Sequence, residues 1–150
     1  MSSTNLQFSD DDLERFVVAQ APVSASVLGE LIAGAKLTHW MWFVFPQLRA
    51  LGYSDMAKFY GLADLAEAIA YRAHPILGAR LIENCEAMRP HAYAGAISVL
   101  GNVDAMKWRS CLTLFAATPD APPLFTELIA AFYDGKTDER TVALLGLCKS

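Results

Sequence analysis

One segment of the chain, Lys36–Leu48, carries four aromatic side chains between a Lys-x-x-His pair and a Pro-Gln pair. At about 100° per residue these side chains point all round a helix, and in an extended strand they fall on both faces. In either conformation the segment is surrounded by protein, so we expect it to form the centre of the core. A charged group at its edge would then lie beside a wall that excludes water. The four aromatic residues are Trp40, Trp42, Phe43 and Phe45.

The composition is that of a folded protein. The chain has 150 residues, of which 54% are hydrophobic and 19% charged, and this balance excludes a disordered protein. We expect residues 1–8 to be a flexible leader and residues 9–150 to form a single domain. The net charge of −4 and the lack of a basic run argue against nucleic acid as a partner. Apolar runs shorter than ~20 residues and a terminus without a signal-peptide pattern predict a cytoplasmic protein with no membrane partner.

Cysteines, histidines and motifs suggest no cofactor. The three cysteines, Cys85, Cys111 and Cys148, are far apart, and none forms a Cys-x-x-Cys motif, which is typical of reduced, buried thiols. Three scattered histidines without a His-Glu-x-x-His motif predict no metal site. The chain has neither a Gly-rich phosphate loop nor a Gly-x-Ser-x-Gly elbow. The motifs therefore name no reaction, and whether the protein is an enzyme stays open.

The spacing of apolar and capping residues predicts an all-α fold of about eight short helices, not a simple four-helix bundle. No segment alternates apolar and polar residues for long, so strands are not expected. The expected N-caps are Ser9, Ser24 or Ser26, Ser54, Asp64, Asn102 or Asp104, and Asp138. The expected helices cover residues 11–21, 54–60, 64–71, 75–88, 124–133 and 138–147, with a short helical turn at 96–100. One more begins at residue 24 or 26 and fades near 34, and another begins at 102 or 104 and ends near 117.

Motifs in both halves of the chain resemble one protein family. The first half has Asp12-Leu13-x-Arg15-Phe16, Gly34-x-Lys36-x-x-His39-Trp40-Met41-Trp42-Phe43 and Phe45-Pro46-Gln47-Leu48. The second half has His74-Pro75-x-Leu77-Gly78-x-Arg80-Leu81 and Gly101-x-x-Asp104-x-x-Lys107-x-Arg109-Ser110-x-x-Thr113-Leu114-Phe115. On these motifs, which keep their order from Asp12 to Leu145, the chain resembles the bacterial domain-of-unknown-function family 1810. The resemblance implies a single all-α domain with no established activity.

Members of that family often carry the label calpastatin. Calpastatin inhibits as a disordered chain with repeats, whereas this chain is compact by composition and has no internal repeat at a fixed period. We therefore give the label no weight.

Lys36 and His39 are the first candidate site residues. They share a face if the preceding helix persists, and the aromatic residues follow at once. An imidazole can act as a general base and a lysine beside it can hold an anion, so His39 is the candidate catalytic residue. The alternative is structural: the lysine stem packs along the aromatic rings, and the histidine binds a backbone carbonyl.

Arg109, Ser110 and Thr113 form the second candidate cluster. A guanidinium group with nearby hydroxyls suits a phosphate or carboxylate, because charge-assisted, forked hydrogen bonds fix an anion. The alternative is that the hydroxyls bind the carbonyl one turn back in their helix.

Several other polar residues lie beside apolar positions. The amides of Gln20 and Gln47 can pair with a nucleobase edge or tie down a turn of the chain, and tethering is favoured, as it is for Arg15. His74 precedes a proline and is expected to cap a turn, and His91 is expected to be solvated.

Two hypotheses on function follow. In the first, the aromatic segment faces the second cluster across a cleft and binds a small anionic, nucleotide-like ligand. In the second, the polar residues are structural, and exposed apolar surface forms a homodimer or a partner interface, which the mean hydropathy of +0.28 favours. The expected ligand-binding residues are Lys36, His39, Trp42, Gln47, Arg109, Ser110 and Thr113.

Overall fold

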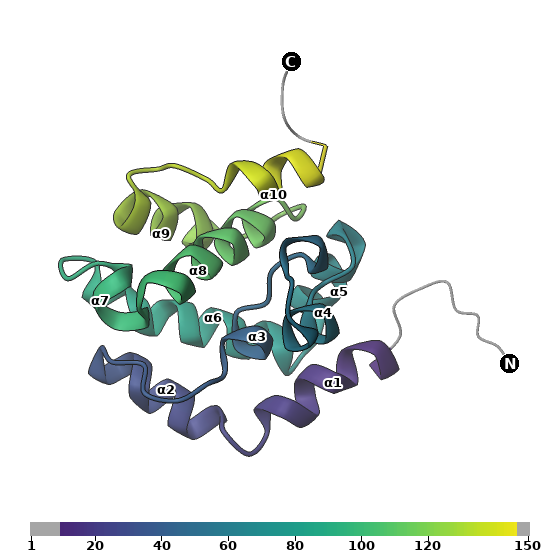
Figure 1. The fold of residues 1–150 in the computed structure, drawn as a ribbon, viewed down its shortest axis with the longest axis horizontal. Coiled ribbons are helices and arrows are strands. Elements are labelled where there is room, and N and C mark those ends of the chain that lie inside the picture. Colours follow the sequence, from purple (N-terminus) through teal and green to yellow (C-terminus); the bar gives the residue numbers. More distant parts are fainter. Residues whose placement is uncertain (1–9, 147–150) are drawn as a thin grey trace, which may run out of the picture.

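The computed structural model describes residues 10–146 and confirms the all-α fold class (Figure 1). This part of the chain contains ten α-helices and two short 3-10 helices but no strand, and Leu48 and Leu62 form an isolated parallel bridge. The leader predicted for residues 1–8 lies outside the described residues. The helices are α1 (Asp10–Gln20), α2 (Ser24–Ala33), α3 (Met41–Val44), η1 (Arg49–Leu51), α4 (Asp55–Tyr60), α5 (Leu65–Ala73), α6 (Leu77–Met88), η2 (Arg89–His91), α7 (Ala96–Leu100), α8 (Asn102–Ala116), α9 (Leu124–Tyr133) and α10 (Glu139–Leu144).

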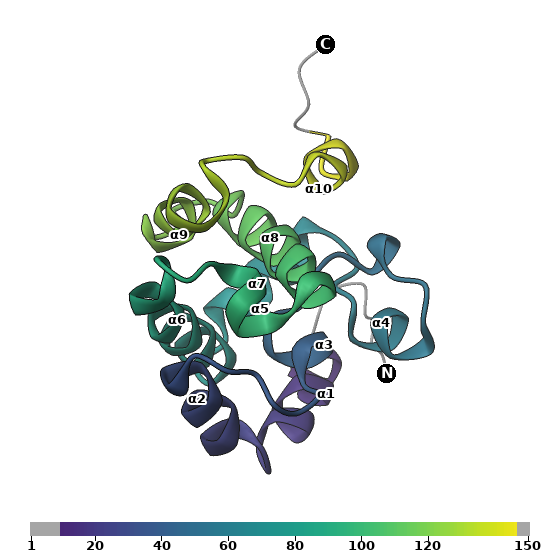
Figure 2. The same ribbon diagram turned by 60° about the vertical axis from the view of Figure 1, so that its left-hand side comes forward.

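Helix α8 lies in the middle of the fold. It contacts α9 and α10 on one side and α5 and α7 on others, while α6 packs against α5 and α9 (Figure 2). The first two helices form a V along the lower edge in Figure 1, where α2 packs on α6 and α1 packs on α3. The long central helix is therefore covered by neighbours from both halves of the chain.

The core is built on aromatic contacts, and the aromatic segment lies in it as predicted. Trp108 of α8 packs against Phe45 and Phe132, with ring centroids 5.9 and 4.9 Å apart. Phe45 in turn packs against Trp40 at 6.1 Å. Trp40 and Phe45 are fully buried, whereas Trp42 is only partly buried.

Local capping explains why the helices begin where they do. The side chains of Ser54, Asp64 and Asp138 each accept a backbone N–H from the first turn of the next helix, at 2.9–3.1 Å. These three predicted caps are confirmed. Helices α2 and α8 instead follow Val23 and Gly101 and have no side-chain cap, so the caps predicted at Ser24 or Ser26 and at Asn102 or Asp104 were wrong. The cap predicted at Ser9 lies outside the described residues. His74 is also a cap as expected, because its Nδ1 accepts the N–H groups of Ile76 and Leu77 before α6.

His91 is not solvated, and that expectation was wrong. Its Nε2 lies 2.8 Å from the carbonyl oxygen of Leu31 and 3.2 Å from that of Ile32, at the C-terminal end of α2. The imidazole therefore satisfies carbonyls that have no partner within the helix. Gly34 leaves room for it, since an added Cβ would lie 2.9 Å from the ring.

Other polar and sulfur groups are structural as predicted. The amide nitrogen of Gln20 donates to the carbonyl of Phe43 at 2.6 Å and to the hydroxyl of Tyr71 at 3.0 Å, which ties α1 to α3 and α5. Cys85 and Cys111 are free, buried thiols, and Cys148 lies outside the described residues.

The length and polarity of the described helices bear on whether the chain crosses a membrane. No single helix among them is long and apolar enough to cross a bilayer. Helices α1 and α2 meet the length and composition criteria only together, and they bend by 65° at the break between them.

Glu30 fastens the loop that leads into the aromatic segment. Its carboxylate accepts the backbone N–H groups of Leu37 and Thr38, the hydroxyl of Thr38 and the indole N–H of Trp40, at 2.6–3.1 Å. Burial raises the pKa of Glu30, but these hydrogen bonds lower it by more, from 4.5 to about 2. The folded protein therefore favours the ionised carboxyl group.

Because the ionised form is favoured in the folded state, the contribution of Glu30 to the free energy of unfolding is fully present above pH 4.5 and is lost as the pH falls towards about 2. Glu30→Gln should remove this dependence and lower the free energy of unfolding at neutral pH by about 1–3 kcal/mol. Urea denaturation followed by tryptophan fluorescence, at neutral pH and at about pH 3, measures both effects. Glu83→Gln, on an exposed position of α6, is the matched control. A Glu30→Gln variant with the pH profile of the unaltered protein would contradict this role.

Candidate functional site

A cavity of about 300 Å³ lies between α8 and the chain that follows α3. Helix α8 supplies one wall through residues spaced three and four apart, which share one helix face. The opposite wall comes from the segment around η1, and the start of α10 closes one end. The lining residues are Val103, Met106, Lys107 and Ser110 of α8, Gln47, Leu51 and Tyr53 opposite, and Asp138 and Arg140 at the end.

Lys107 brings a positive charge to the cavity without forming an ion pair with a described residue. Its Nζ lies over the ring of Trp42, 5.7 Å from the centroid, at the distance of a cation–π contact. Within residues 10–146 the structure places no carboxylate at ion-pair distance from it. A second cation, Arg140, lies exposed at the rim. The acidic lining residue, Asp138, is engaged as the cap of α10 by the N–H and hydroxyl groups of Thr141.

Gln47 and Ser110 supply neutral polar groups. The backbone of Gln47 is fixed because its carbonyl accepts the N–H of Leu62 at 2.9 Å, and its side-chain amide has no hydrogen bond among the described residues. The hydroxyl of Ser110 donates to the carbonyl of Met106 at 3.3 Å, so its oxygen can still accept a hydrogen bond. The amide can therefore donate and accept, and the serine can accept, from a bound group.

The rim of the cavity is apolar and open. Tyr53 is 81% exposed, Met106 71% and Val103 64%, while Leu51 is buried behind them. A planar or apolar part of a ligand could lie against these side chains while its polar groups reach Lys107 and Gln47.

The structure brings together three of the residues that the sequence analysis selected. Gln47 and Ser110 line the cavity, and Trp42 lies next to it beneath Lys107. The exposed His39 and the residues Lys36, Arg109 and Thr113 do not line it.

Lys36 is engaged in structural contacts. Its Nζ lies 3.0 Å from the carboxylate of Asp104 and 2.7 Å from the carbonyl oxygen of Thr38, and it lies 5.0 Å from the ring centroid of Trp40. The lysine thus joins the loop before α3 to the first turn of α8.

Arg109 and Thr113 tie α8 to the loop before α10. The guanidinium of Arg109 donates to the carbonyls of Lys136 and Thr137 at 2.9 and 2.7 Å. The hydroxyl of Thr113 donates to the carbonyl of Arg109 at 2.8 Å and accepts the N–H of Asp138 at 2.9 Å. These contacts fit the structural interpretation, in which helical hydroxyls bind the carbonyl one turn back.

Seven of the nine lining residues were not selected from the sequence, and three of these matter most for binding: Tyr53, Lys107 and Arg140. For Lys107 a signal was present, because residues 103, 106, 107 and 110 have the spacing of one helix face. For Tyr53 and Arg140 there was none, since only the folded chain places them beside α8.

The chemistry of the other reactive groups is also limited by their surroundings. Burial raises the pKa of the Cys85 thiol and that of the Cys111 thiol, so neither is a ready thiolate nucleophile. The buried indole N–H of Trp108 has no hydrogen-bond partner among the described residues. In the same part of the chain, no group of three or more His, Cys, Asp or Glu side chains is arranged to hold a metal ion.

The fold and cavity define a small all-α protein with a candidate site for a small ligand. The sequence matches the family described as "Protein of unknown function (DUF1810)" over residues 10–145, so the chain belongs to this family. It is similar in structure to the conserved hypothetical protein Rv1873 from Mycobacterium tuberculosis, with a TM-score of 0.89 and 48% sequence identity. The match covers 93% of this chain and 100% of that one. The comparison with curated proteins found no match.

The structural role of Arg109 predicts a loss of stability when it is replaced. Arg109→Met should lower the free energy of unfolding by about 1–3 kcal/mol, because two backbone carbonyls lose a charged donor. Arg140→Met is the matched control, since its guanidinium makes no hydrogen bond to the described residues, and it should stay within about 0.5 kcal/mol. Urea denaturation measures both, and equal stability of Arg109→Met and the unaltered protein would contradict the role.

Proposed function

We propose that this protein binds a small anionic ligand in the cavity between α8 and the segment Gln47–Tyr53. The observation that carries the proposal is the ammonium group of Lys107, which borders a cavity of about 300 Å³ and has no described carboxylate within ion-pair distance. Ligand sites commonly measure roughly 300–1,000 Å³ and combine apolar walls with a few polar groups. This cavity has that composition.

The lining favours a ligand with an anionic group and a planar group. Lys107 and Arg140 would bind the anion, while the ring of Tyr53 and the side chain of Met106 offer surface for stacking. The amide of Gln47 can pair with a donor–acceptor edge such as that of a nucleobase. The small volume favours a mononucleotide or a smaller phosphorylated metabolite over a dinucleotide. The expected cytoplasmic location, which stays a prediction, would place such metabolites within reach.

The proposal is one of binding, without a reaction attached. His39, the candidate base, does not line this cavity. An enzymatic step would need a ligand large enough to extend from the cavity to that exposed imidazole.

One observation favours a second candidate function, self-association. The same rim exposes Tyr53, Val103 and Met106, and the neighbouring α7 exposes Ile97. Apolar side chains gathered on one face can form a homodimer interface, as the second hypothesis from the sequence holds.

A thermal-shift screen tests the ligand proposal. Against a panel of nucleotides and phosphorylated metabolites at constant ionic strength, at least one compound should raise the melting temperature by mass action. Lys107→Met should weaken the binding of that compound about tenfold or more, because it removes the ammonium group that would bind the anion. Isothermal titration calorimetry measures the change in affinity.

The matched control for this experiment is Lys136→Met, which removes an equally charged but exposed side chain outside the cavity. It should leave the affinity unchanged. A panel without a hit, or a hit that binds equally to Lys107→Met, would refute the ligand proposal.

Sedimentation velocity tests the second candidate. If the rim is a dimer interface, the unaltered protein should sediment as a dimer at micromolar concentration, and Met106→Glu should return it to a monomer. Ile69→Glu, at an exposed apolar position of α5, is the matched control. A protein that stays monomeric throughout would count against self-association.

A further inference from the structure

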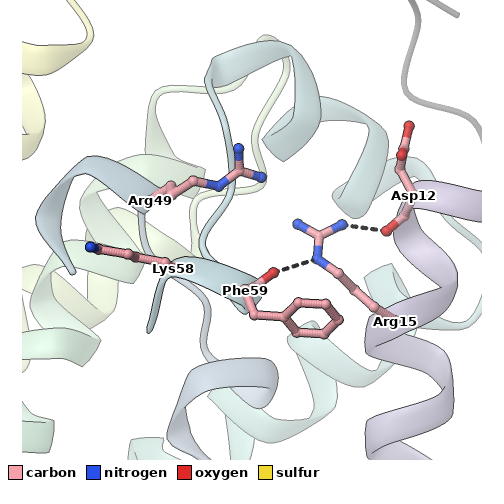
Figure 3. Close-up of a pocket in the computed structure, with 5 residues that line it drawn as sticks. All are labelled: Asp12, Arg15, Arg49, Lys58 and Phe59. Carbon is pink, nitrogen blue, oxygen red and sulfur yellow. Dashed lines mark hydrogen bonds between the residues drawn. The ribbon is translucent and has the colours of Figure 1, made fainter. Parts of the chain in front are cut away.

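A second hollow, of about 600 Å³ and open to solvent, lies between α1, α4 and η1 (Figure 3). Three cationic residues line it, and in a chain with a net charge of −4 they form a local concentration of positive charge. The lining residues are Asp12, Arg15, Arg49, Lys58 and Phe59.

Arg15 is held rigidly in this hollow. Its Nε donates to the carbonyl of Phe59 at 2.9 Å and its Nη2 to that of Gly61 at 3.2 Å. Its Nη1 donates to the carbonyl of Asp12 and to the buried carboxylate of Glu67. Because a guanidinium has five N–H donors, one remains, and it is on Nη2.

Arg49 enters the hollow from the other side. Its backbone N–H donates to the carbonyl of Leu62 at 2.7 Å, and Gly61 packs so closely that an added Cβ would lie 2.3 Å from the Cα of Arg49. The segment 59–62 thus positions both arginines. Figure 3 shows the guanidinium of Arg49 pointing towards that of Arg15, while the side chain of Lys58 points away.

The two facing guanidinium groups differ in how their charge is balanced. Glu67, whose side chain is 1% exposed, neutralises Arg15. For Arg49, no described carboxylate lies at ion-pair distance. The carboxylate of Asp12 is directed away from both groups in Figure 3. Like charges that face each other across a hollow repel, whereas each of them would attract an anion placed between them.

We infer that this hollow binds the phosphate group of a phosphate monoester between Arg15 and Arg49. A phosphate offers three terminal oxygens, which can accept hydrogen bonds from the two parallel N–H groups of Arg49 and from the remaining N–H of Arg15. The ring of Phe59, which is 57% exposed, provides apolar surface for the organic part of the ester. The inference is independent of the proposed function, because the two hollows share no lining residue.

Titration of the full chain with phenyl phosphate, followed by ¹H–¹⁵N NMR at constant ionic strength, tests the inference. We expect saturable shifts of the amide signals of Phe59 and Gly61, and competition by inorganic phosphate. Arg49→Met should weaken binding about tenfold or more, because a forked, charged hydrogen bond is lost. Arg49→Lys keeps the charge without the fork and should give an intermediate affinity.

Arg49 suits this test because its guanidinium forms neither a hydrogen bond nor an ion pair with the described residues. Arg49→Met should therefore keep its fold, which circular dichroism and the melting temperature check. Lys136→Met, an exposed lysine elsewhere, is the matched control and should bind like the unaltered protein. The inference fails if the unaltered protein shows no saturable shift, or if Arg49→Met binds with unchanged affinity. It also fails if Lys107→Met abolishes binding while Arg49→Met does not, since the phosphate then occupies the cavity at α8.

Discussion

Phe45 packs between the indole rings of Trp40 and Trp108, with centroid distances of 6.1 and 5.9 Å, and this contact joins the aromatic segment to the central helix. Glu30 holds the indole N–H of Trp40, so the loop before the segment is fixed as well. Since the segment and α8 cannot move apart without separating these rings, the residues that follow the segment face α8 at a set distance. The cavity lined by Gln47 and Lys107 is a consequence of this packing.

Local features explain what could be predicted of the fold. The limits of α9 and the caps Asp64 and Asp138 depend on neighbours within a few residues, and the structure confirms them. Long-range partners could not be foreseen. His91 was expected to be solvated because nothing near it in the sequence reveals the carbonyl of Leu31, which lies 60 residues away. The same limit applies wherever a partner comes from another helix.

The same contrast between local features and long-range partners explains what could be predicted of the candidate site. Gln47 could be selected as a polar residue beside dense apolar positions, and Ser110 as a hydroxyl clustered with Arg109 and Thr113; both line the cavity. Lys36 and Arg109 had the right chemistry for an anion, but tertiary structure supplies them with Asp104 and with backbone carbonyls. Lys107, which borders the cavity, has no described carboxylate within ion-pair distance. Charge type is visible in a sequence, whereas its compensation is a property of the fold.

We propose that an anion binds at Lys107, in the cavity whose rim includes Tyr53. A crystal structure of the protein with the compound that most raises its melting temperature tests this claim most directly. We expect density for the anionic group within about 2.7–3.2 Å of the Nζ of Lys107, with the contact between Lys36 and Asp104 intact. Density elsewhere on the molecule, or an anion held by Lys36 and Arg109 after their present contacts have broken, would contradict it.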